Sequence, residues 1–316
     1  YFIANLFSKE SYFHNVLCWM KGINTVMEKI DIHIHTRLPK YSGEGRFKST
    51  GSTETMDYLN KQQIVHGIIM SMGETELPNN AECAEICQEE KNLHWNCNFD
   101  AKDPKNIFKR MEACKKLGAV GVGELFINEK IDSPIIQAIF VAAEQLELPI
   151  LFHMSPEIGY GYGIVDDPKL PILEKALKKH PKLKLIGHSP TFWSEISKDA
   201  PSDKESRSER GMGKVIPEGR LVELMRTYPN LYGDLSAGSG YCAITRDEDF
   251  GLKFLETFSD QLLFGTDTIS VHETWQSPLS KWLEGMYMQG MLSEATMRKI
   301  CYENAQKIYN LNVKVK

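Results

Sequence analysis

The sequence lacks the long apolar run that a transmembrane helix requires. No segment reaches about 18 uninterrupted apolar residues, so the chain is not expected to span a membrane. It also lacks a disulfide framework, because its 7 cysteines are odd in number and scattered. Cys83 and Cys87 are close in sequence but have no second pair with metal-ligand spacing. We therefore expect a protein of a reducing compartment, the cytoplasm.

An excess of positive charge is missing as well. The 316 residues include 37 Lys and Arg against 42 Asp and Glu, a formal net charge of −5. This balance argues against nucleic-acid binding through a broad basic surface. No Gly-x-Gly-x-x-Gly motif opens a helix after the first expected strand, which weakens a dinucleotide-binding interpretation. An enzyme that acts on a small molecule fits these constraints best.

Residues 1–26 differ from the rest of the chain. They are rich in aromatic residues, and charged residues interrupt any apolar core. No small-residue cleavage site follows, so they do not read as a signal peptide. We expect residues 1–26 to form an N-terminal arm or leader outside the main domain, or Met27 to be the natural start. Residues 27–316 are expected to form one domain.

From residue 28 onward, short apolar strands alternate with helices. The expected strands cover residues 29–35, 64–70, 93–99, 119–125, 149–153, 183–187, 231–235 and 262–265. The expected helices cover residues 53–61, 78–91, 104–117, 133–148, 167–180, 217–228, 246–258 and 278 onward. Near-continuous apolar strands are typical of a parallel sheet covered on both faces. Eight such units predict an α/β fold, the (β/α)8 TIM barrel, with a doubly wound open sheet as the alternative. The charged residues 197–213 are expected to be a solvated loop, with a mobile lid or an oligomer contact as the alternative.

Side chains that can bind metal end five of the eight expected strands. His33 and His35 end the first strand at a spacing of two, which puts both imidazoles on one side. In a barrel these strand ends meet at the carboxyl-terminal mouth, where active sites lie. Burying such groups without a partner is costly, so a shared metal ion explains them economically. The other strand ends carry Glu124, His153, His188 and Asp267.

These motifs together resemble a known family. They are the segment Asp31-Ile32-His33-Ile34-His35, the later His153 and His188, and the segment 263–267 (Leu-Phe-Gly-Thr-Asp). The set is similar to the amidohydrolase superfamily of metal-dependent (β/α)8 barrels. It is most similar to the amidohydrolase-2 branch, the relatives of aminocarboxymuconate semialdehyde decarboxylase, whose usual last helix residues 303–309 match. The resemblance covers residues 28–312 and implies a metal-dependent enzyme, in a dimer or higher oligomer.

The resemblance also implies a role for each motif residue. His33, His35, His153 and Asp267 would bind a divalent metal ion, most often Zn, with Mn, Fe or Ni as alternatives. His188 would hold or polarise the reacting oxygen, or bind a second metal ion. Asp267 would in addition take the proton from the metal-activated water.

The role of Glu124 decides whether the site is expected to hold one metal ion or two. Much of the branch works with one metal ion. In other superfamily members, including TatD-type nucleases, a glutamate on the fourth strand bridges two, and residues 121–125 resemble that motif. With Glu124 as the bridge, His33, His35 and Asp267 would form the first site. His153 and His188 would then form the second.

Substrate-binding candidates lie on the loops that follow these strands. Basic residues after the first strand could receive a carboxylate, and aromatic residues after the later strands could line a pocket. A solvated loop is the alternative for the basic residues. The candidates are Arg37, Tyr160, Tyr162, Trp193 and His272.

Three reactions fit this reading. The first is metal-dependent hydrolysis of a small ester, lactone or amide. The second is non-oxidative decarboxylation of an aromatic or unsaturated carboxylic acid, which the branch also contains. The third is a TatD-like nuclease, for which the loop with Arg207, Arg210 and Lys214 would have to supply a local basic surface.

Overall fold

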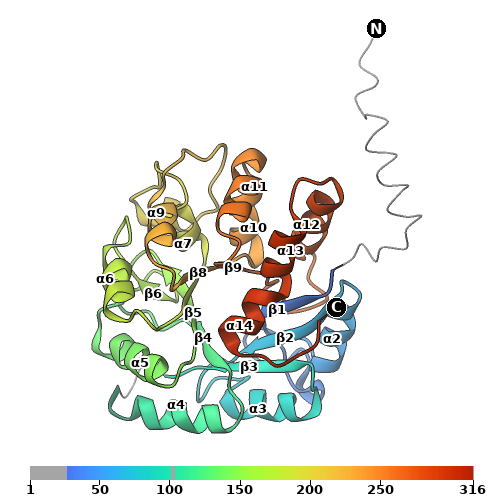
Figure 1. The fold of residues 1–316 in the computed structure, drawn as a ribbon. Coiled ribbons are helices and arrows are strands. Elements are labelled where there is room, and N and C mark those ends of the chain that lie inside the picture. The colour runs from blue at the N-terminus through green and yellow to red at the C-terminus, as the bar shows by residue number, and fades with distance from the viewer. Residues whose placement is uncertain (1–26, 101–103, 316) are drawn as a thin grey trace, which may run out of the picture.

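The computed structural model describes residues 27–100 and 104–315. Figure 1 shows strands at the centre with helices around them. The strands are β1 (Lys29–Ile34), β2 (Ile64–Met70), β3 (Leu93–Cys97), β4 (Gly121–Leu125), β5 (Ile150–Ser155), β6 (Ile164–Val165), β7 (Leu185–His188), β8 (Leu231–Asp234) and β9 (Leu262–Leu263). All but β6 follow one parallel path in the order β1-β2-β3-β4-β5-β7-β8-β9, and β6 pairs with β5. The predicted arm, residues 1–26, lies outside the described residues.

Backbone hydrogen bonds between the ends of the path bring β9 and β1 together. Ile32 N donates to Phe264 O at 3.1 Å, and Asp267 N donates to His33 O at 2.8 Å. The predicted (β/α)8 TIM barrel is therefore confirmed, as a nearly closed barrel of eight parallel strands. The open-sheet alternative is excluded by these contacts.

The helices lie outside the strands and cover them. They are α2 (Ser52–Asn60), α3 (Asn80–Glu89), α4 (Ile107–Lys116), α5 (Pro134–Gln145), α6 (Pro171–Lys179), α7 (Pro190–Ser194), α8 (Lys204–Arg207), α9 (Arg220–Thr227), α10 (Ala237–Thr245), α11 (Glu248–Thr257), α12 (Leu279–Met288), α13 (Glu294–Arg298) and α14 (Asn304–Tyr309). Short 3-10 turns span Pro39–Tyr41 and Pro104–Asn106, and a π-helical turn spans Lys299–Glu303. None of the described helices has the length and apolar character needed to cross a bilayer.

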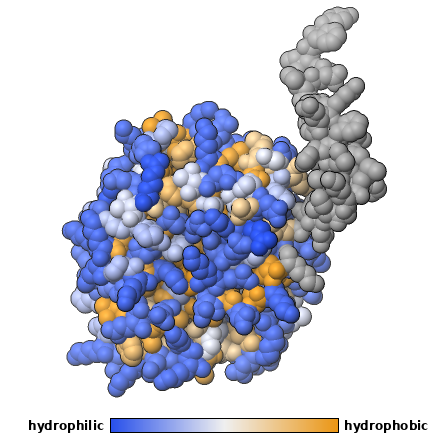
Figure 2. Space-filling model, in the orientation of Figure 1, coloured by the Kyte–Doolittle hydropathy of each residue, from blue (hydrophilic) through white to orange (hydrophobic). Residues whose placement is uncertain are grey.

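The core is made from the strands and from the inner faces of these helices. Every residue of β1 is buried, and α9 buries its apolar positions on one face. Apolar side chains removed from water on both sides of the sheet supply the main stabilisation of such a fold. The face seen in Figure 2 is mostly hydrophilic, with scattered apolar residues between.

Several parts of the fold differ from the sequence expectation, among them the short strand β6 and the short helix α7, which were not predicted. Residues 197–213 are not only a solvated loop, because they contain α8, and Arg207 on α8 is buried. Its Nη1 donates to Pro156 O at 3.2 Å and to Asp166 O at 3.1 Å, which ties the segment to the loop after β5. Helix α10 was not expected, because its two glycines lower helix propensity.

Candidate metal centre

The predicted ligands come together at the carboxyl-terminal mouth of the barrel. The side chains of His33, His35, Glu124 and His188 are nine-tenths or more buried, while His153 and Asp267 are partly exposed. Glu124 follows Gly123, whose φ is +143°, and a Cβ there would lie 2.5 Å from Leu151 O. Glycine is therefore required for β4 to approach β5 this closely.

The predicted ligands form one cluster, whose members are His33, His35, Glu124, His153, His188 and Asp267. One half of this cluster lies around one oxygen of Glu124. Glu124 Oε2 is 3.7 Å from His33 Nε2 and 4.0 Å from His35 Nε2. Asp267 Oδ1 lies 3.4 Å and 3.3 Å from the same two nitrogens. Two imidazoles and two carboxylates therefore face one point.

The other half lies around the second oxygen of Glu124. Glu124 Oε1 is 2.7 Å from His153 Nδ1 and 3.9 Å from His188 Nε2. The second oxygen of Asp267, Oδ2, is 3.9 Å from His188 Nε2. The Glu124 carboxylate thus stands between two pairs of histidines.

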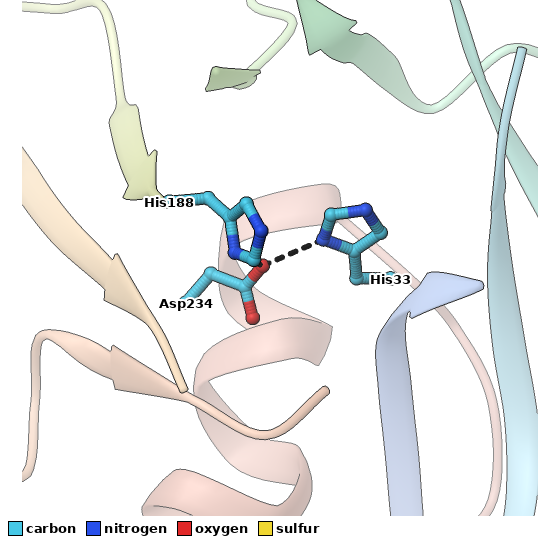
Figure 3. A group of neighbouring side chains, drawn as sticks. All are labelled: His33, His188 and Asp234. Carbon is cyan, nitrogen blue, oxygen red and sulfur yellow. Dashed lines mark hydrogen bonds and ion pairs between the residues drawn. The ribbon is translucent and has the colours of Figure 1, made fainter. Parts of the chain in front are cut away.

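Asp234, at the end of β8, supports both halves and was missed by the sequence reasoning. Its Oδ2 accepts a hydrogen bond from His33 Nδ1 at 2.7 Å and lies 3.1 Å from His188 Nδ1 (Figure 3). The hydroxyl of Ser236 also donates to this oxygen, at 2.7 Å. A proton on Nδ1 leaves the Nε2 lone pair of each imidazole free to bind a metal ion. A signal was available, because Asp234 is the last residue but one of the expected strand 231–235, as Glu124 is of the expected strand 119–125.

Ionised carboxylates dominate the electrostatics of the cluster. Burial opposes charge on Asp234, but hydrogen bonds from His188 and His33 hold the pKa of its carboxyl below its usual value. Burial would also lower the pKa of His33, yet the charge of Asp267 and the hydrogen bond to Asp234 raise it well above 6.5. The pKa of the Glu124 carboxyl is lowered mainly by His153, against the effect of burial. The metal-free cluster therefore holds protons on imidazoles beside ionised acids.

Asp31 holds in place the two backbone segments that carry His33 and Asp267. Its Oδ1 accepts hydrogen bonds from the backbone N–H groups of His33 and Thr266, each at 3.0 Å, and its Oδ2 accepts one from the Thr266 hydroxyl at 2.6 Å. Burial raises the pKa of Asp31 to about 7 despite these bonds. Asp31 thus links β1 to the segment that carries Asp267.

The residues present fit a metal ion. His33 Nε2 is buried without a hydrogen-bond partner among the described residues, although it faces two carboxylates. A buried polar atom without a partner is costly unless a ligand satisfies it. Imidazole nitrogens and carboxylate oxygens are ligands that Zn²⁺ accepts. The clusters that could hold a metal ion are His33, His35 and Glu124; Glu124, His153 and His188; and His33, His188 and Asp234.

Two of the predicted substrate-binding residues lie at the mouth. The Tyr162 ring centroid is 4.2 Å from that of His153, and the side chain is 46% exposed. Tyr160 is 39% exposed on the same loop, where Lys204 lies 5.7 Å from its ring centroid. Substrate binding by these tyrosines stays a prediction.

The other three candidates have partners within the protein, and substrate binding by them stays a prediction. Arg37 is buried, and its Nε and Nη2 donate to the two carboxylate oxygens of Glu82 at 2.9 and 3.1 Å. Trp193 is also buried, and its Nε1 donates to Asp234 O at 3.1 Å. The His272 side chain is 71% exposed, with Nε2 3.2 Å from Glu54 Oε1. Sequence spacing could place these residues after the strands that end at the mouth but could not identify their partners.

Comparisons with known proteins agree with this architecture. A family model described as amidohydrolase matches residues 30–311. No curated protein matches the chain. Among solved structures, an apo protein of Agrobacterium tumefaciens has a TM-score of 0.59 at 16% identity and covers 91% of this chain and 97% of its own.

Two further similar structures contain bound ligands. An Acinetobacter baumannii protein described as a probable 2-pyrone-4,6-dicarboxylic acid hydrolase, with citric acid bound, has a TM-score of 0.57 at 12% identity. It covers 90% of this chain and 100% of its own. An amidohydrolase of Burkholderia multivorans with bound Zn has a TM-score of 0.53 at 13% identity and covers 90% and 99%. At these identities the likeness establishes the fold.

Proposed function

Because the chain belongs to the amidohydrolase family, we propose that it is a metal-dependent hydrolase of a small ester, lactone or amide. The observation that carries this proposal is the position of Glu124. One of its oxygens faces His33 and His35, and the other faces His153 and His188. A carboxylate in this position is suited to join two cationic centres.

The proposed cofactor is a pair of divalent metal ions, with Zn first and Mn, Fe or Ni as alternatives. His33, His35 and Asp267 would hold one ion, His153 and His188 the other, and Glu124 both. When bound, such ions lower the pKa of water and polarise a carbonyl group. The bound Zn of the Burkholderia multivorans amidohydrolase supports the choice of metal.

Asp267 is the proposed proton acceptor. The Asp267 side chain is 22% exposed, so it can contact both the other cluster residues and a bound substrate. Burial opposes its ionisation, but the charge of His33 and the hydrogen bond of His35 lower the pKa of its carboxyl. Asp267 is therefore ionised at neutral pH and can take the proton of the attacking water. His188, fixed by Asp234, would orient the reacting oxygen, and Tyr162 would border the substrate.

The Acinetobacter baumannii protein, described as a probable 2-pyrone-4,6-dicarboxylic acid hydrolase, supports a lactone among the substrate classes, because a 2-pyrone is a cyclic ester. The basic loop that a nuclease would require is weaker than expected, since Arg207 points into the protein. We also propose a cytoplasmic location, because the scattered cysteines are typical of a reducing compartment. We further propose a homo-oligomer, because the family resemblance implies a dimer or higher oligomer.

A hydrolysis panel tests the proposal. The chain, loaded with Zn, is assayed with aryl esters, aryl lactones and anilides, and with aromatic acids for CO2 release. We expect hydrolysis that a chelator abolishes and Zn restores. Asp267→Ala should lose activity, while Asp132→Ala, which removes an exposed acid elsewhere, should keep it. Release of CO2 without hydrolysis would replace the proposal with the decarboxylase alternative.

A further inference from the structure

The first turn of α10 presents backbone donors next to the metal centre. Its N-cap residue is Ser236, but the Ser236 hydroxyl does not cap the helix. That hydroxyl instead donates to Asp234 and lies 3.2 Å from the Nδ1 atoms of His33 and His188. The Ser236 hydroxyl therefore bonds to the cluster and accepts no hydrogen bond from the helix. As a result, the N–H groups of Gly238 and Ser239 have no hydrogen-bond partner among the described residues.

A buried hydroxyl in the same turn is also unsatisfied. Ser239 is 4% exposed, and its Oγ has no hydrogen-bond partner among the residues that the structure describes. Native structures rarely leave such a buried group without a partner. The turn therefore offers three unpaired donors at the positive end of a helix of 9 residues.

Arg210, from the loop after β7, lies against this turn. A Cβ on Gly238 would be 2.1 Å from Arg210 Cζ, so the missing side chain makes the space that the guanidinium occupies. Arg210 Cζ also lies 5.5 Å from the ring centroid of Trp275, on the loop after β9. No acidic side chain in residues 27–100 and 104–315 pairs with Arg210. Stacking uses the face of the guanidinium and leaves its in-plane N–H donors available.

We propose that Arg210 and the first turn of α10 form an oxyanion subsite that binds a carboxylate or phosphate group of the substrate. Helix N-termini bind such anions through free N–H groups and the helix dipole. In TIM barrels, the loops after the last two strands and an extra helix often supply this kind of site. Here β8 and β9 are the last two strands of the path, and α10 precedes the helix α11 that follows β8.

The subsite deepens the proposed function and rests on it. Ser236 contacts both the histidines and the helix start, so the subsite adjoins the metal centre. A substrate bound there would place its anionic group on Arg210 and its scissile carbonyl near Asp267. The substrate class is then an anionic ester, lactone or amide.

Calorimetric titration of the Zn-loaded chain tests the subsite without catalysis. The probes are benzoate and phenylphosphonate, which carry a carboxylate and a phosphonate on the same ring and contain no ester to cleave. We expect Arg210→Ala to weaken binding of the preferred probe about 10-fold or more, the loss typical of charge-assisted hydrogen bonds. Gly238→Ala should cause a similar loss, because the new Cβ must displace the guanidinium, while alanine favours the helix.

The control is Lys214→Ala, which removes an exposed positive charge from the same segment and should leave both Kd values unchanged. A larger loss of benzoate binding in Arg210→Ala indicates a carboxylate substrate, and a larger loss of phenylphosphonate binding indicates a phosphorylated one. Equal Kd values in the wild type, Arg210→Ala and Gly238→Ala would overturn the subsite, even if the chain proves to be a hydrolase. Conversely, Arg210-dependent binding in a chain that hydrolyses nothing would keep the subsite and remove the proposed function.

Discussion

Asp234 Oδ2 accepts a hydrogen bond from His33 Nδ1 at 2.7 Å, between two side chains that are fully buried. This contact fixes the tautomer and the ring plane of His33, so that its Nε2 faces Glu124 and Asp267. The same oxygen lies 3.1 Å from His188 Nδ1, so one carboxylate orients a histidine of each half of the cluster.

We predict that Asp234→Asn weakens metal binding about 10- to 100-fold, the range typical for partners of metal ligands. The amide keeps the size of the side chain but loses the charge that supports both imidazoles. Competition with a fluorescent chelator measures the affinity. Ser236→Ala removes a smaller contact to the same oxygen and should have a smaller effect. Equal affinities in Asp234→Asn and the wild type would refute the positioning role.

Metal binding should release protons and weaken as the pH falls. In the metal-free cluster, burial alone would lower the pKa values of His33 and His188, but the surrounding carboxylates raise both above 6.5. An imidazole must lose its Nε2 proton before it can bind a metal ion, and a raised pKa makes that loss harder at lower pH. Calorimetry of Zn²⁺ binding in buffers of different ionisation enthalpy counts the released protons. A count of zero between pH 6 and 7 would contradict this prediction.

Arg37 should matter for stability and not for substrate binding. Arg37→Met leaves the buried Glu82 carboxylate without its charged partner, which we expect to cost about 3–5 kcal/mol in the free energy of unfolding. Denaturant unfolding measures this loss. The double variant Arg37→Met with Glu82→Met removes both charges and should recover much of the stability. A KM that rises in the double variant, with stability restored, would instead support the substrate role first predicted for Arg37.

The barrel and the clustering of the candidate metal ligands could be predicted from the sequence because both depend on local, periodic signals. His33 and His35 are two residues apart on one strand, and parallel strands place their carboxyl ends at one mouth. The position of Asp234 near the end of an expected strand was a signal, but the sequence could not show that its carboxylate contacts the Nδ1 atoms of His33 and His188.

The loop residues could not be predicted for a different physical reason. The side chain of Arg37 follows β1, as a substrate-binding residue would, but its partner Glu82 is 45 positions away on α3. Only the packing of α3 against the loop decides whether the guanidinium faces inward or toward the mouth. The role of Arg207 was obscured in the same way, since its contacts with Pro156 and Asp166 are also long-range.

The central claim is that Glu124 joins two metal sites, and metal counting tests it most directly. Elemental analysis of the Zn-loaded chain should give about two ions per chain, falling to about one or fewer in Glu124→Gln. Glu157→Gln, which changes an exposed glutamate on the loop after β5, should keep about two. A wild-type chain that holds one ion or none, with Glu124→Gln unchanged, would contradict the account.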